Sequence, residues 1–276
     1  MDIGLLTAPF GNNMKFREIA EWASKAGFGA LEVIAGPGAH LSADAILPDE
    51  GKSVRKILDD NAIRVSSLAY YKLFNVNMDA RTYTREFKEL ISAAQMLGVD
   101  TVCALSGFPA AGKSKMQTIK EALPGVFAPI ADEAAKRGVK IAFENWFATN
   151  LQHLDHFKAL TEVLPQPNVG FNFDPSHLAW QEIDYFAAVE EFAPRIFHTH
   201  AKDVLISQDR LERLGVLEGG WWRYVIPGYG CVRWGEYIHT LRQAGYNGVL
   251  SIEHEDGAFS AQEGFEKGLR FLSALV

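Results

Sequence analysis

Four strand-like apolar runs of this sequence end in a side chain that can bind a metal ion. The four residues are Glu144, Asp174, His200 and Glu253. Three carboxylates and one imidazole form a mostly oxygen donor set, which suits Mn²⁺, Mg²⁺ or Co²⁺, with Zn²⁺ as the alternative ion. Without a cation, carboxylates crowded together would repel one another. These residues therefore predict one divalent metal site; the competing interpretation is ordinary solvated or salt-bridged charges at strand termini.

Further polar side chains lie close in sequence to the predicted ligands. His177 comes one turn after Asp174 and can reach a hydroxyl or carbonyl group of a substrate, although a water-facing histidine at a helix start is the alternative. Glu255 shares a strand face with Glu253 if the strand continues, so we predict that it binds substrate or orients a ligand. Glu32, near the end of an earlier strand, is a weaker candidate.

Aromatic residues and the segment around His200 add to the candidate site. Four tryptophans fall in loops on the expected site side: Trp146, Trp180, Trp221 and Trp222. Indole rings suit the apolar faces of sugars, and Trp146 is predicted to contact substrate, although packing explains each ring nearly as well. His198 shares a strand face with His200 but lies deeper, where a hydrogen-bonded core histidine is expected. Lys202 and Asp203 are expected to order the following loop.

Strands that alternate with helices must position these residues. Apolar residues at helical spacing predict helices at 16–26, 54–60 and 83–97. Left-handed caps are predicted after helices at Gly27, Asn61, Gly98, Gly138 and Gly245. The first four caps are 34, 37 and 40 residues apart, the size of one strand-plus-helix unit. Strands are predicted at 3–8, 30–34, 63–69, 101–105, 139–144, 169–174, 195–200 and 249–253.

Eight parallel strands that alternate with helices over 276 residues predict an α/β fold, a (β/α)8 TIM barrel, in a single domain spanning 1–276. An open doubly wound sheet is the competing architecture, but it usually carries a glycine-rich turn after the first strand, which residues 8–14 lack. In such barrels the site lies at the carboxyl ends of the strands. Glu144, Asp174, His200 and Glu253 end the fifth to eighth strands and should therefore converge at one side of the barrel mouth.

Composition limits the functional class. The formal net charge of −7 disfavours a nucleic-acid groove, which is normally basic. The two cysteines, Cys103 and Cys231, imply no disulfide framework and fit a reducing cytosol. The sequence shows neither a signal-peptide pattern nor an apolar stretch of membrane length, so a cytoplasmic protein without a membrane partner is expected. Whether the chain forms a homo-oligomer is left open.

One motif points to a different function. Gly107–Ser114 matches the G-x-x-x-x-G-K-[ST] phosphate loop and follows a strand. Its context is poor, because Pro109 stiffens the loop, Pro124 breaks the helix soon after, and no acidic partner strand for magnesium is evident. We therefore interpret the segment as a loop on the site side of the barrel, with nucleotide binding as the alternative.

The second half of the chain resembles the xylose isomerase-like barrels known as sugar phosphate isomerases/epimerases, which include the ketose 3-epimerases and the endonuclease IV-type repair enzymes. The shared segments are 141–145, 172–177, 200–203, 227–230 with Trp234, and 251–253. The first half matches only in its strand–helix rhythm. The repair enzymes need more histidine ligands and a DNA-binding groove, so the acidic balance of this chain disfavours DNA repair.

The resemblance implies roles for individual residues. It implies that the four predicted ligands bind one divalent metal, commonly Mn²⁺, and that Glu144 and Glu253 also serve as catalytic acid and base. His177 would hold the substrate. The ketose epimerases place an arginine shortly before the Pro-Gly-x-Gly loop, and Arg223 is its expected counterpart, although 204–222 is an insertion after the histidine strand.

We therefore predict a metal-dependent sugar isomerase or epimerase. It would remove a proton next to the carbonyl of a keto sugar, or of its phosphate, through a metal-stabilised enediolate. If a leaving group sits β to the carbanion, the same intermediate eliminates, so a metal-dependent lyase or dehydratase acting on a 3-keto-glycoside or an inosose is the alternative. A catalytically silent sugar-binding barrel is a third possibility and would bind sugar without a metal.

Overall fold

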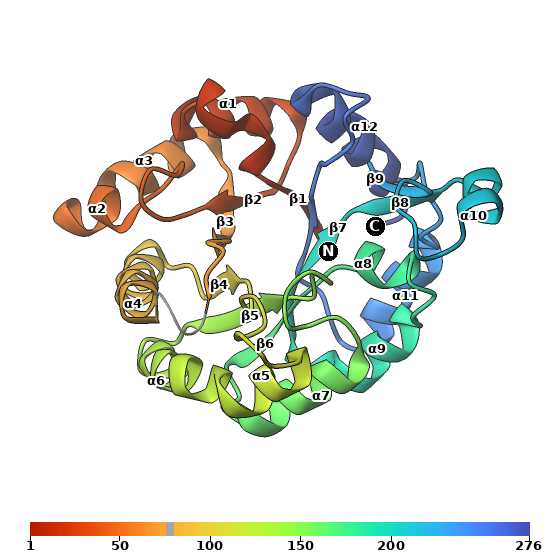
Figure 1. Ribbon diagram of the computed structural model, residues 1–276. Coiled ribbons are helices and arrows are strands. Elements are labelled where there is room, and N and C mark those ends of the chain that lie inside the picture. The colour runs from red at the N-terminus through yellow and green to blue at the C-terminus, as the bar shows by residue number, and fades with distance from the viewer. Residues whose placement is uncertain (76–79) are drawn as a thin grey trace.

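The computed structural model describes residues 1–75 and 80–276, and its centre is a closed barrel of parallel strands (Figure 1). Around the barrel the strands follow the order β1-β10-β7-β6-β5-β4-β3-β2. Their bounds are β1 Asp2–Leu6, β2 Ala30–Ile34, β3 Arg64–Tyr70, β4 Thr101–Ala104, β5 Lys140–Glu144, β6 Val169–Phe173, β7 Ile196–Ala201 and β10 Val249–Ile252. The predicted (β/α)8 barrel is confirmed, and the open sheet is excluded because β1 pairs with both β2 and β10.

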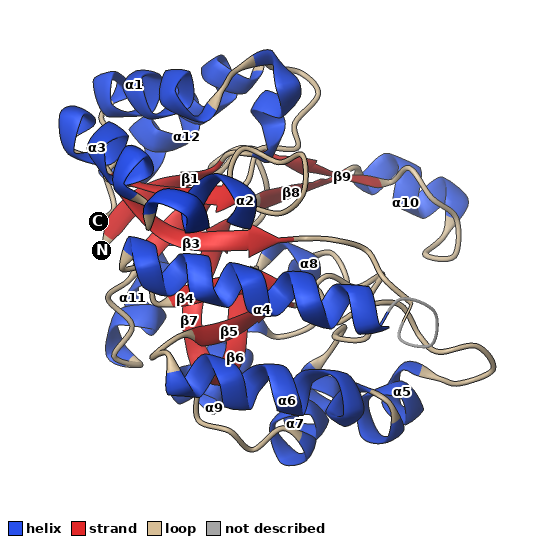
Figure 2. Ribbon diagram, turned by 90° about the vertical axis from the view of Figure 1, so that its left-hand side faces the viewer, coloured by secondary structure: helices blue, strands red, loops and turns tan. Residues whose placement is uncertain are grey.

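Helices form a ring outside the barrel (Figures 1 and 2). Their bounds are α1 Phe16–Ala26, α2 Ala43–Ile46, α3 Lys52–Asn61, α4 Ala80–Leu97, α5 Lys115–Glu121, α6 Leu123–Lys136, α7 Leu154–Val163, α8 Ser176–Ala179, α9 Tyr185–Phe192, α10 Gln208–Leu214, α11 Trp234–Gln243 and α12 Ala261–Ser273, with 3-10 turns η1 Ala8–Asn13, η2 Leu47–Asp49 and η3 Ala193–Arg195. Within the described ranges, none of these helices is both long and apolar enough to cross a membrane.

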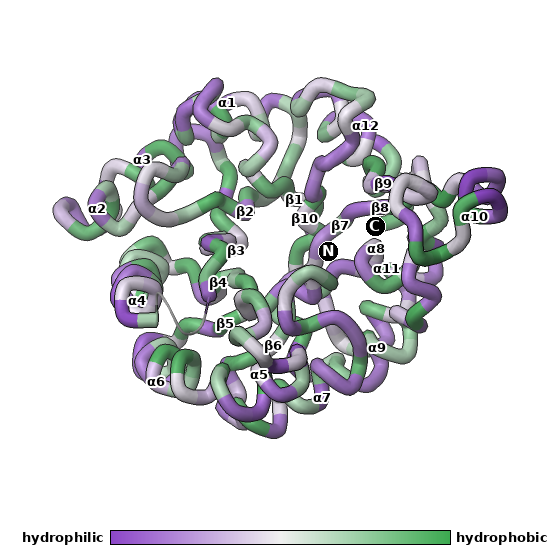
Figure 3. The backbone as a smooth tube through the Cα atoms, in the orientation of Figure 1, coloured by the Kyte–Doolittle hydropathy of each residue, from purple (hydrophilic) through white to green (hydrophobic). Residues whose placement is uncertain are grey.

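The main hydrophobic core lies between the strands and the helix ring. The strands are buried almost throughout, as expected for a parallel sheet covered on both faces. The ring helices are amphipathic, and Figure 3 shows hydrophobic and hydrophilic segments alternating along them. Phe127 of α6, for example, packs edge-on against Phe143 of β5, with 4.7 Å between the ring centroids. This core holds the strand ends in fixed positions.

The glycine caps predicted from the sequence are present. Gly27, Gly98, Gly138 and Gly245 all have positive φ angles, between 68° and 98°. The prediction for Asn61 needs correction, because Asn61 is the last residue of α3 and the left-handed residue is Ala62, with φ 48°. The Asn61 side chain donates a hydrogen bond to the Ile57 carbonyl within the helix, so the turn begins one residue later.

The inserted segment after β7 forms a two-stranded antiparallel hairpin. Strand β8, Asp203–Ile206, pairs with β9, Trp222–Val225, and α10 lies between them in the sequence. The hairpin and α10 extend outward from the barrel in both ribbon views (Figures 1 and 2). Trp222 therefore belongs to a strand and not to a loop as the sequence suggested. The register of this hairpin decides which side chains reach the barrel mouth.

Candidate functional site

The structure brings the four predicted ligands together at the ends of four neighbouring strands. Glu144 ends β5, His200 lies in β7, and Asp174 and Glu253 directly follow β6 and β10. One ligand atom of each side chain lies within 4.8 Å of the other three, and all four residues are buried. This spacing is one that a single ion can bridge with ordinary metal–ligand distances.

Two of the ligand atoms are buried without a hydrogen bond. In the described part of the chain these are Asp174 Oδ2 and His200 Nδ1. His200 Nδ1 lies 2.9 Å from Glu253 Oε2 and 3.5 Å from Glu144 Oε1, so donor atoms from three strands converge. Asp174 Oδ2 likewise has an ion-pair neighbour, Lys202 Nζ at 3.2 Å, but no hydrogen bond. Buried donor atoms without hydrogen bonds, in a set of three carboxylates and one imidazole, fit a divalent cation.

Asp174 is oriented by the start of the loop that follows β6. Its Oδ1 accepts a hydrogen bond of 2.8 Å from the Ser176 backbone N–H, which leaves Oδ2 directed at the cluster. The Asn145 side chain holds the Asp174 backbone on both sides, since its Oδ1 accepts from the Asp174 N–H at 2.7 Å and its Nδ2 donates to the Asp174 carbonyl. Asn145 and Ser176 therefore position a predicted ligand.

The two glutamates of the cluster are held ionised. Burial alone would raise the pKa of Glu253, but the charges of Lys202 and His200 outweigh it and lower that pKa to about 2. Burial opposes ionisation of Glu144 in the same way, and the hydrogen bond with His177 and the nearby His200 ring nevertheless hold its pKa far below the usual range. Both carboxylates are therefore available to bind a cation at neutral pH.

Lys202 is a member of the site that the sequence identified only as a loop residue. Its side chain is 1% exposed, and its Nζ lies 2.7 Å from Glu253 Oε2 and 3.2 Å from Asp174 Oδ2. Burial would lower the pKa of Lys202, but Glu253 and Asp174 outweigh it and hold the pKa well above the usual range. The ammonium also lies 4.3 Å from the Tyr224 ring centroid, within cation–π distance.

Glu32, a weak candidate from sequence, lies directly behind His200. Its Oε2 is 3.0 Å from His200 Nε2 and accepts a hydrogen bond from the Ser251 hydroxyl at 2.7 Å. Its Oε1 accepts from the Tyr71 hydroxyl at 2.6 Å. Burial would raise the pKa of Glu32, but the charges of His200 and His198 lower it to about 2. The carboxylate is thus an ionised partner of the His200 ring.

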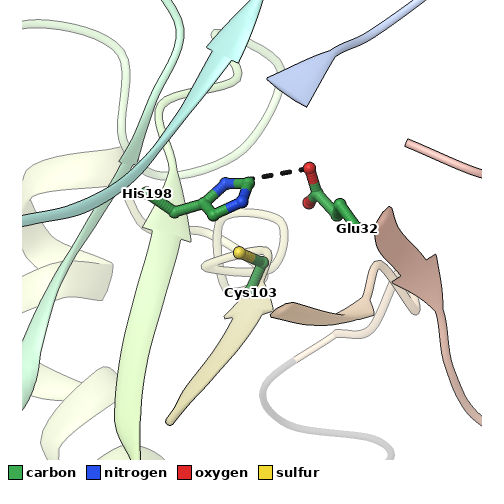
Figure 4. A group of neighbouring side chains, drawn as sticks. All are labelled: Glu32, Cys103 and His198. Atoms are coloured by element: carbon green, nitrogen blue, oxygen red, sulfur yellow. Dashed lines mark ion pairs between the residues drawn. The ribbon is translucent and has the colours of Figure 1, made fainter. Parts of the chain in front are cut away.

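A second buried group could in principle hold a metal ion. Glu32, Cys103 and His198 point toward one another from β2, β4 and β7 (Figure 4). However, His198 Nδ1 is 3.0 Å from Asn172 Oδ1 and its Nε2 is 3.1 Å from Ser66 Oγ, so both ring nitrogens have partners. Burial also raises the pKa of the Cys103 thiol well above its usual range. We interpret the group as a hydrogen-bonded layer beneath the site, as predicted for His198.

His177 reaches the site, and the inserted hairpin supports it. His177 Nε2 lies 3.1 Å from Glu144 Oε1, and Nδ1 lies 2.6 Å from the Tyr224 hydroxyl. Burial raises the pKa of Tyr224 far above its usual value, so its hydroxyl group stays protonated and can donate to Nδ1. Tyr224 could not be identified from the sequence, because its placement depends on the register of β9.

A pocket of about 450 Å³ opens above the cluster. Its lining residues are Tyr71, Leu73, Leu105, Glu144, Trp146, Phe147, His177, Lys202, Trp222, Tyr224, Glu253 and Glu255. Trp146 and Glu255 thus lie where the sequence predicted contact with substrate. Trp180 does not line the pocket but stacks behind Trp222, with 4.3 Å between the ring centroids, and Trp221 packs edge-on against Trp180.

The prediction for Arg223 is not supported by its position. Residues alternate between the two faces of a strand, and on β9 it is Trp222 and Tyr224 that line the pocket. Arg223 lies between them in sequence and is absent from the lining. Its Nη1 forms an ion pair of 2.6 Å with Asp256 Oδ1, and its side chain is 52% exposed. The alternation of side chains along β9 therefore explains why Arg223 lies outside the pocket.

Asp203 was expected to order the segment directly after it, but it begins β8 and orders the loop after the hairpin. Its two carboxylate oxygens accept hydrogen bonds from the backbone N–H groups of Val204, Gly228, Gly230 and Val232 and from the Trp234 indole. Gly228 has a φ of +89°, and a Cβ at Gly230 would lie 2.3 Å from Asp203 Oδ1. Gly230 is thus required by the close approach of this carboxylate, and Gly228 by its left-handed backbone conformation.

The segment that matches a phosphate loop is committed to other contacts. The Ser114 hydroxyl caps α5 by accepting a hydrogen bond from the Gln117 N–H. Lys113 Nζ forms an ion pair of 2.8 Å with Glu121. The two side chains that would contact a nucleotide phosphate and its magnesium are thus used in the structure, which supports the interpretation as a barrel loop.

Comparisons with known proteins bear on this site. The sequence profile of the family Xylose isomerase-like TIM barrel matches residues 20–275. The chain is 26% identical to the uncharacterized protein YfiH of Bacillus subtilis, over 100% of this chain and 99% of that protein. It is also 29% identical to the inosose dehydratase of Clostridium beijerinckii, but over only 44% of this chain and 42% of that enzyme.

Solved structures share the fold over nearly the whole chain. The probable 3-DHS dehydratase AsbF of Bacillus anthracis superposes with a TM-score of 0.79 at 18% identity, covering 99% of each chain. The IOLI protein with a bound zinc atom gives 0.78 at 20% identity, covering 100% of this chain and 98% of that one. The 3-keto-D-glucoside 4-epimerase YcjR of E. coli gives 0.75 at 14% identity, covering 99% of each.

Proposed function

Because the chain belongs to the xylose isomerase-like TIM barrel family, we propose that it is a metal-dependent enzyme that moves a proton next to a carbonyl group of a sugar-like substrate. The cluster of four ligand atoms within 4.8 Å of one another carries this proposal. A divalent cation held there would supply a Lewis acid for the substrate carbonyl. The donor set supports Mn²⁺, and the zinc atom of the IOLI structure supports Zn²⁺ as the alternative.

Two carboxylates are placed to exchange protons with a substrate. Glu144 and Glu253 both line the pocket. They come from β5 and β10, the outer two of the four site strands, with β6 and β7 between them. One carboxylate removes the proton from the carbon next to the carbonyl, and a proton then returns. Return to the opposite face inverts that carbon, whereas return to the former carbonyl carbon isomerises the sugar. We take this isomerase or epimerase reaction as the main candidate.

A dehydratase is the second candidate. The similarity to an inosose dehydratase favours it, and so does the buried ammonium of Lys202 in the pocket. In this reaction a glutamate takes the proton from the carbon next to the carbonyl, and the C–O bond at the next carbon breaks. The glutamate then gives its proton to the leaving hydroxyl group, which departs as water. The product is an α,β-unsaturated ketone.

The mass of the product separates the two candidates. The metal-loaded protein would be incubated with free keto sugars, a 3-keto-glycoside and 2-keto-myo-inositol, and the products followed by NMR and mass spectrometry. An isomerase or epimerase gives a product of unchanged mass. Elimination gives a product lighter by one water, or by the aglycone alcohol when the substrate is the 3-keto-glycoside, and this product absorbs in the near ultraviolet. Elimination without any epimer across the panel would overturn our preference.

The ligand assignment has its own test. We expect the protein to bind one equivalent of Mn²⁺ and the variants Asp174→Ala and His200→Ala to lose it while remaining folded. Asp209→Ala and His239→Ala are the matched controls, because both residues are exposed and outside the cluster. Elemental analysis after gel filtration measures the metal, and circular dichroism the fold. Stoichiometric metal in both site variants would contradict the assignment.

A further inference from the structure

We propose that this pocket takes an uncharged polyhydroxylated ketone and rejects phosphorylated sugars. The inference rests on the proposed function and narrows its substrate. Among the described residues that line the pocket, Lys202 is the one ammonium, and no guanidinium is present. Residues 76–79, which fall outside the described ranges, are Val-Asn-Met-Asp and add no basic side chain. Phosphate groups are normally bound by arginine, lysine or clustered backbone N–H groups.

The cations near the pocket are already paired. Lys202 Nζ lies within 3.3 Å of carboxylate oxygens of Asp174, Glu253 and Glu255. Arg223 is held by Asp256 on the other face of β9. A phosphate could pair with Lys202 or Arg223 only if that side chain gave up one of these carboxylate partners. A phosphate bound without a cation would be a desolvated and unpaired charge, which is costly.

A bound metal ion does not reverse this balance. Glu144 and Glu253 line the pocket together with Glu255, and Asp174 lies beneath them. Four carboxylates face one ammonium, so the two charges of a divalent cation still leave an excess negative charge. A phosphate dianion would add to that excess, whereas hydroxyl and carbonyl groups would not.

The place where such barrels usually bind phosphate is acidic here. In this fold the phosphate site is commonly built from the loops after the seventh and eighth barrel strands. After the seventh strand, β7, this chain carries the β8–β9 hairpin, which puts Trp222 and Tyr224 into the pocket. After the eighth, β10, it carries Glu253, Glu255 and Asp256. A carboxylate loop and an aromatic strand thus occupy the position of a phosphate cradle.

The aromatic lining of the pocket suits a neutral polyol. Trp146 and Phe147 face the pocket from the loop after β5, and Trp222 faces it from the hairpin. Phe147 and Trp222 meet edge-to-face, with ring centroids 5.9 Å apart, which makes a rigid apolar wall. Rings of this kind cover the C–H face of a sugar or cyclitol, while the Glu255 carboxylate offers acceptor oxygens to its hydroxyl groups.

Binding of unreactive probes tests the inference. The Mn²⁺-loaded protein would be titrated with myo-inositol and myo-inositol 1-phosphate, and with glucitol and glucitol 6-phosphate, near pH ~8 where carboxylates are ionised. Tryptophan fluorescence and calorimetry report binding. We expect each neutral probe to bind at least ~10-fold more tightly than its phosphate ester, because unpaired like charge opposes binding. Equal or tighter binding of the esters, or no binding of either neutral probe, would overturn the inference.

A variant tests the electrostatic cause. Glu255→Gln removes one carboxylate from the pocket and leaves Lys202 with one partner fewer. The ratio of the affinity for a neutral probe to the affinity for its phosphate ester should therefore shrink by about tenfold. The control is Glu218→Gln, an exposed residue beyond α10, which should leave the ratio unchanged. An unchanged ratio in Glu255→Gln would overturn the electrostatic basis.

The inference and the proposed function can fail separately. If the parent protein shows no preference for neutral probes but catalyses metal-dependent proton exchange, only this inference fails. If the preference holds but no exchange occurs, the proposed function fails.

Discussion

Glu32 Oε2 lies 3.0 Å from Nε2 of His200, the ring nitrogen opposite the one that faces the ligand cluster. A carboxylate on the outer nitrogen of a metal-binding histidine fixes the tautomer and the ring orientation and makes the inner nitrogen more basic. The Glu32 side chain is fully buried, and the Ser251 and Tyr71 hydroxyl groups hold it. It is therefore placed to present Nδ1 of His200 to a metal ion.

We expect Glu32→Gln to weaken Mn²⁺ binding by roughly 10–100-fold, because the neutral amide is a poorer acceptor for the His200 ring. Calorimetric titration with Mn²⁺ and with Zn²⁺ measures the affinity. Cys103→Ala is the control, since Cys103 lies in the same buried layer but makes no hydrogen bond to His200. An affinity in Glu32→Gln equal to that of the parent would show that the carboxylate does not position the ligand.

A prediction about stability concerns Asp203. Asp203→Ala would leave four backbone N–H groups, of which those of Val204 and Val232 are buried, and the Trp234 indole without their acceptor. Hydrogen bonds to a charged group contribute more than neutral ones, so we expect a loss of at least about 3 kcal/mol in the free energy of unfolding. Urea denaturation measures it, and the exposed Asp209→Ala on α10 is the control. A loss below about 1 kcal/mol would contradict the role of Asp203 as the acceptor that orders this loop.

A pH dependence is expected from His156, which packs against His153 with 3.7 Å between ring centroids. Burial, followed by the charges of His153 and Lys115, lowers the pKa of His156 to about 4. Between pH ~6.5 and ~4 the unfolded chain therefore binds a proton that the folded chain does not, and stability falls as the pH falls. The contribution is on the order of 1–3 kcal/mol.

His156→Gln removes this titration, so the free energy of unfolding of the variant should change less across that pH range than that of the parent. Urea denaturation at several pH values measures the difference. The exposed His239→Gln should keep the slope of the parent. Parallel pH profiles for the parent and His156→Gln would show that the folded chain holds the proton on His156 as readily as the unfolded one.

Much of the fold could be predicted because its signals are local. Several strand–helix units end in a glycine with a positive φ, and apolar strands leading to Glu144 or Asp174 are visible in short windows. The convergence of the four ligands then follows from barrel geometry. Glu32 could not be ranked in the same way, since its contact with His200 joins residues 168 positions apart. Its role depends on which face of β2 turns inward and on the tilt of the strands.

The part of the pocket wall that the inserted hairpin forms could not be predicted from the sequence. The composition of the hairpin does not reveal whether Trp222 and Tyr224 or Arg223 face the barrel, because a shift of one residue exchanges the two faces. The resemblance to ketose epimerases favoured Arg223, and the register of β8 with β9 turned it away. Lys202 was missed as a pocket residue for a related reason, since its three carboxylate partners lie on the loops that follow two other strands, β6 and β10.

The central claim, that Glu144 and Glu253 exchange a substrate proton next to a carbonyl, is tested most directly by solvent deuterium exchange. The Mn²⁺-loaded protein would be incubated in D2O with a panel of neutral keto sugars and 2-keto-myo-inositol, and deuterium at carbon followed by NMR. We expect metal-dependent exchange for at least one substrate. Glu144→Gln and Glu253→Gln should each slow it by about 10²–10⁴-fold, while the exposed Glu218→Gln leaves it unchanged. Exchange that is equally fast in both site variants, or absent across the panel with metal bound, would contradict the account.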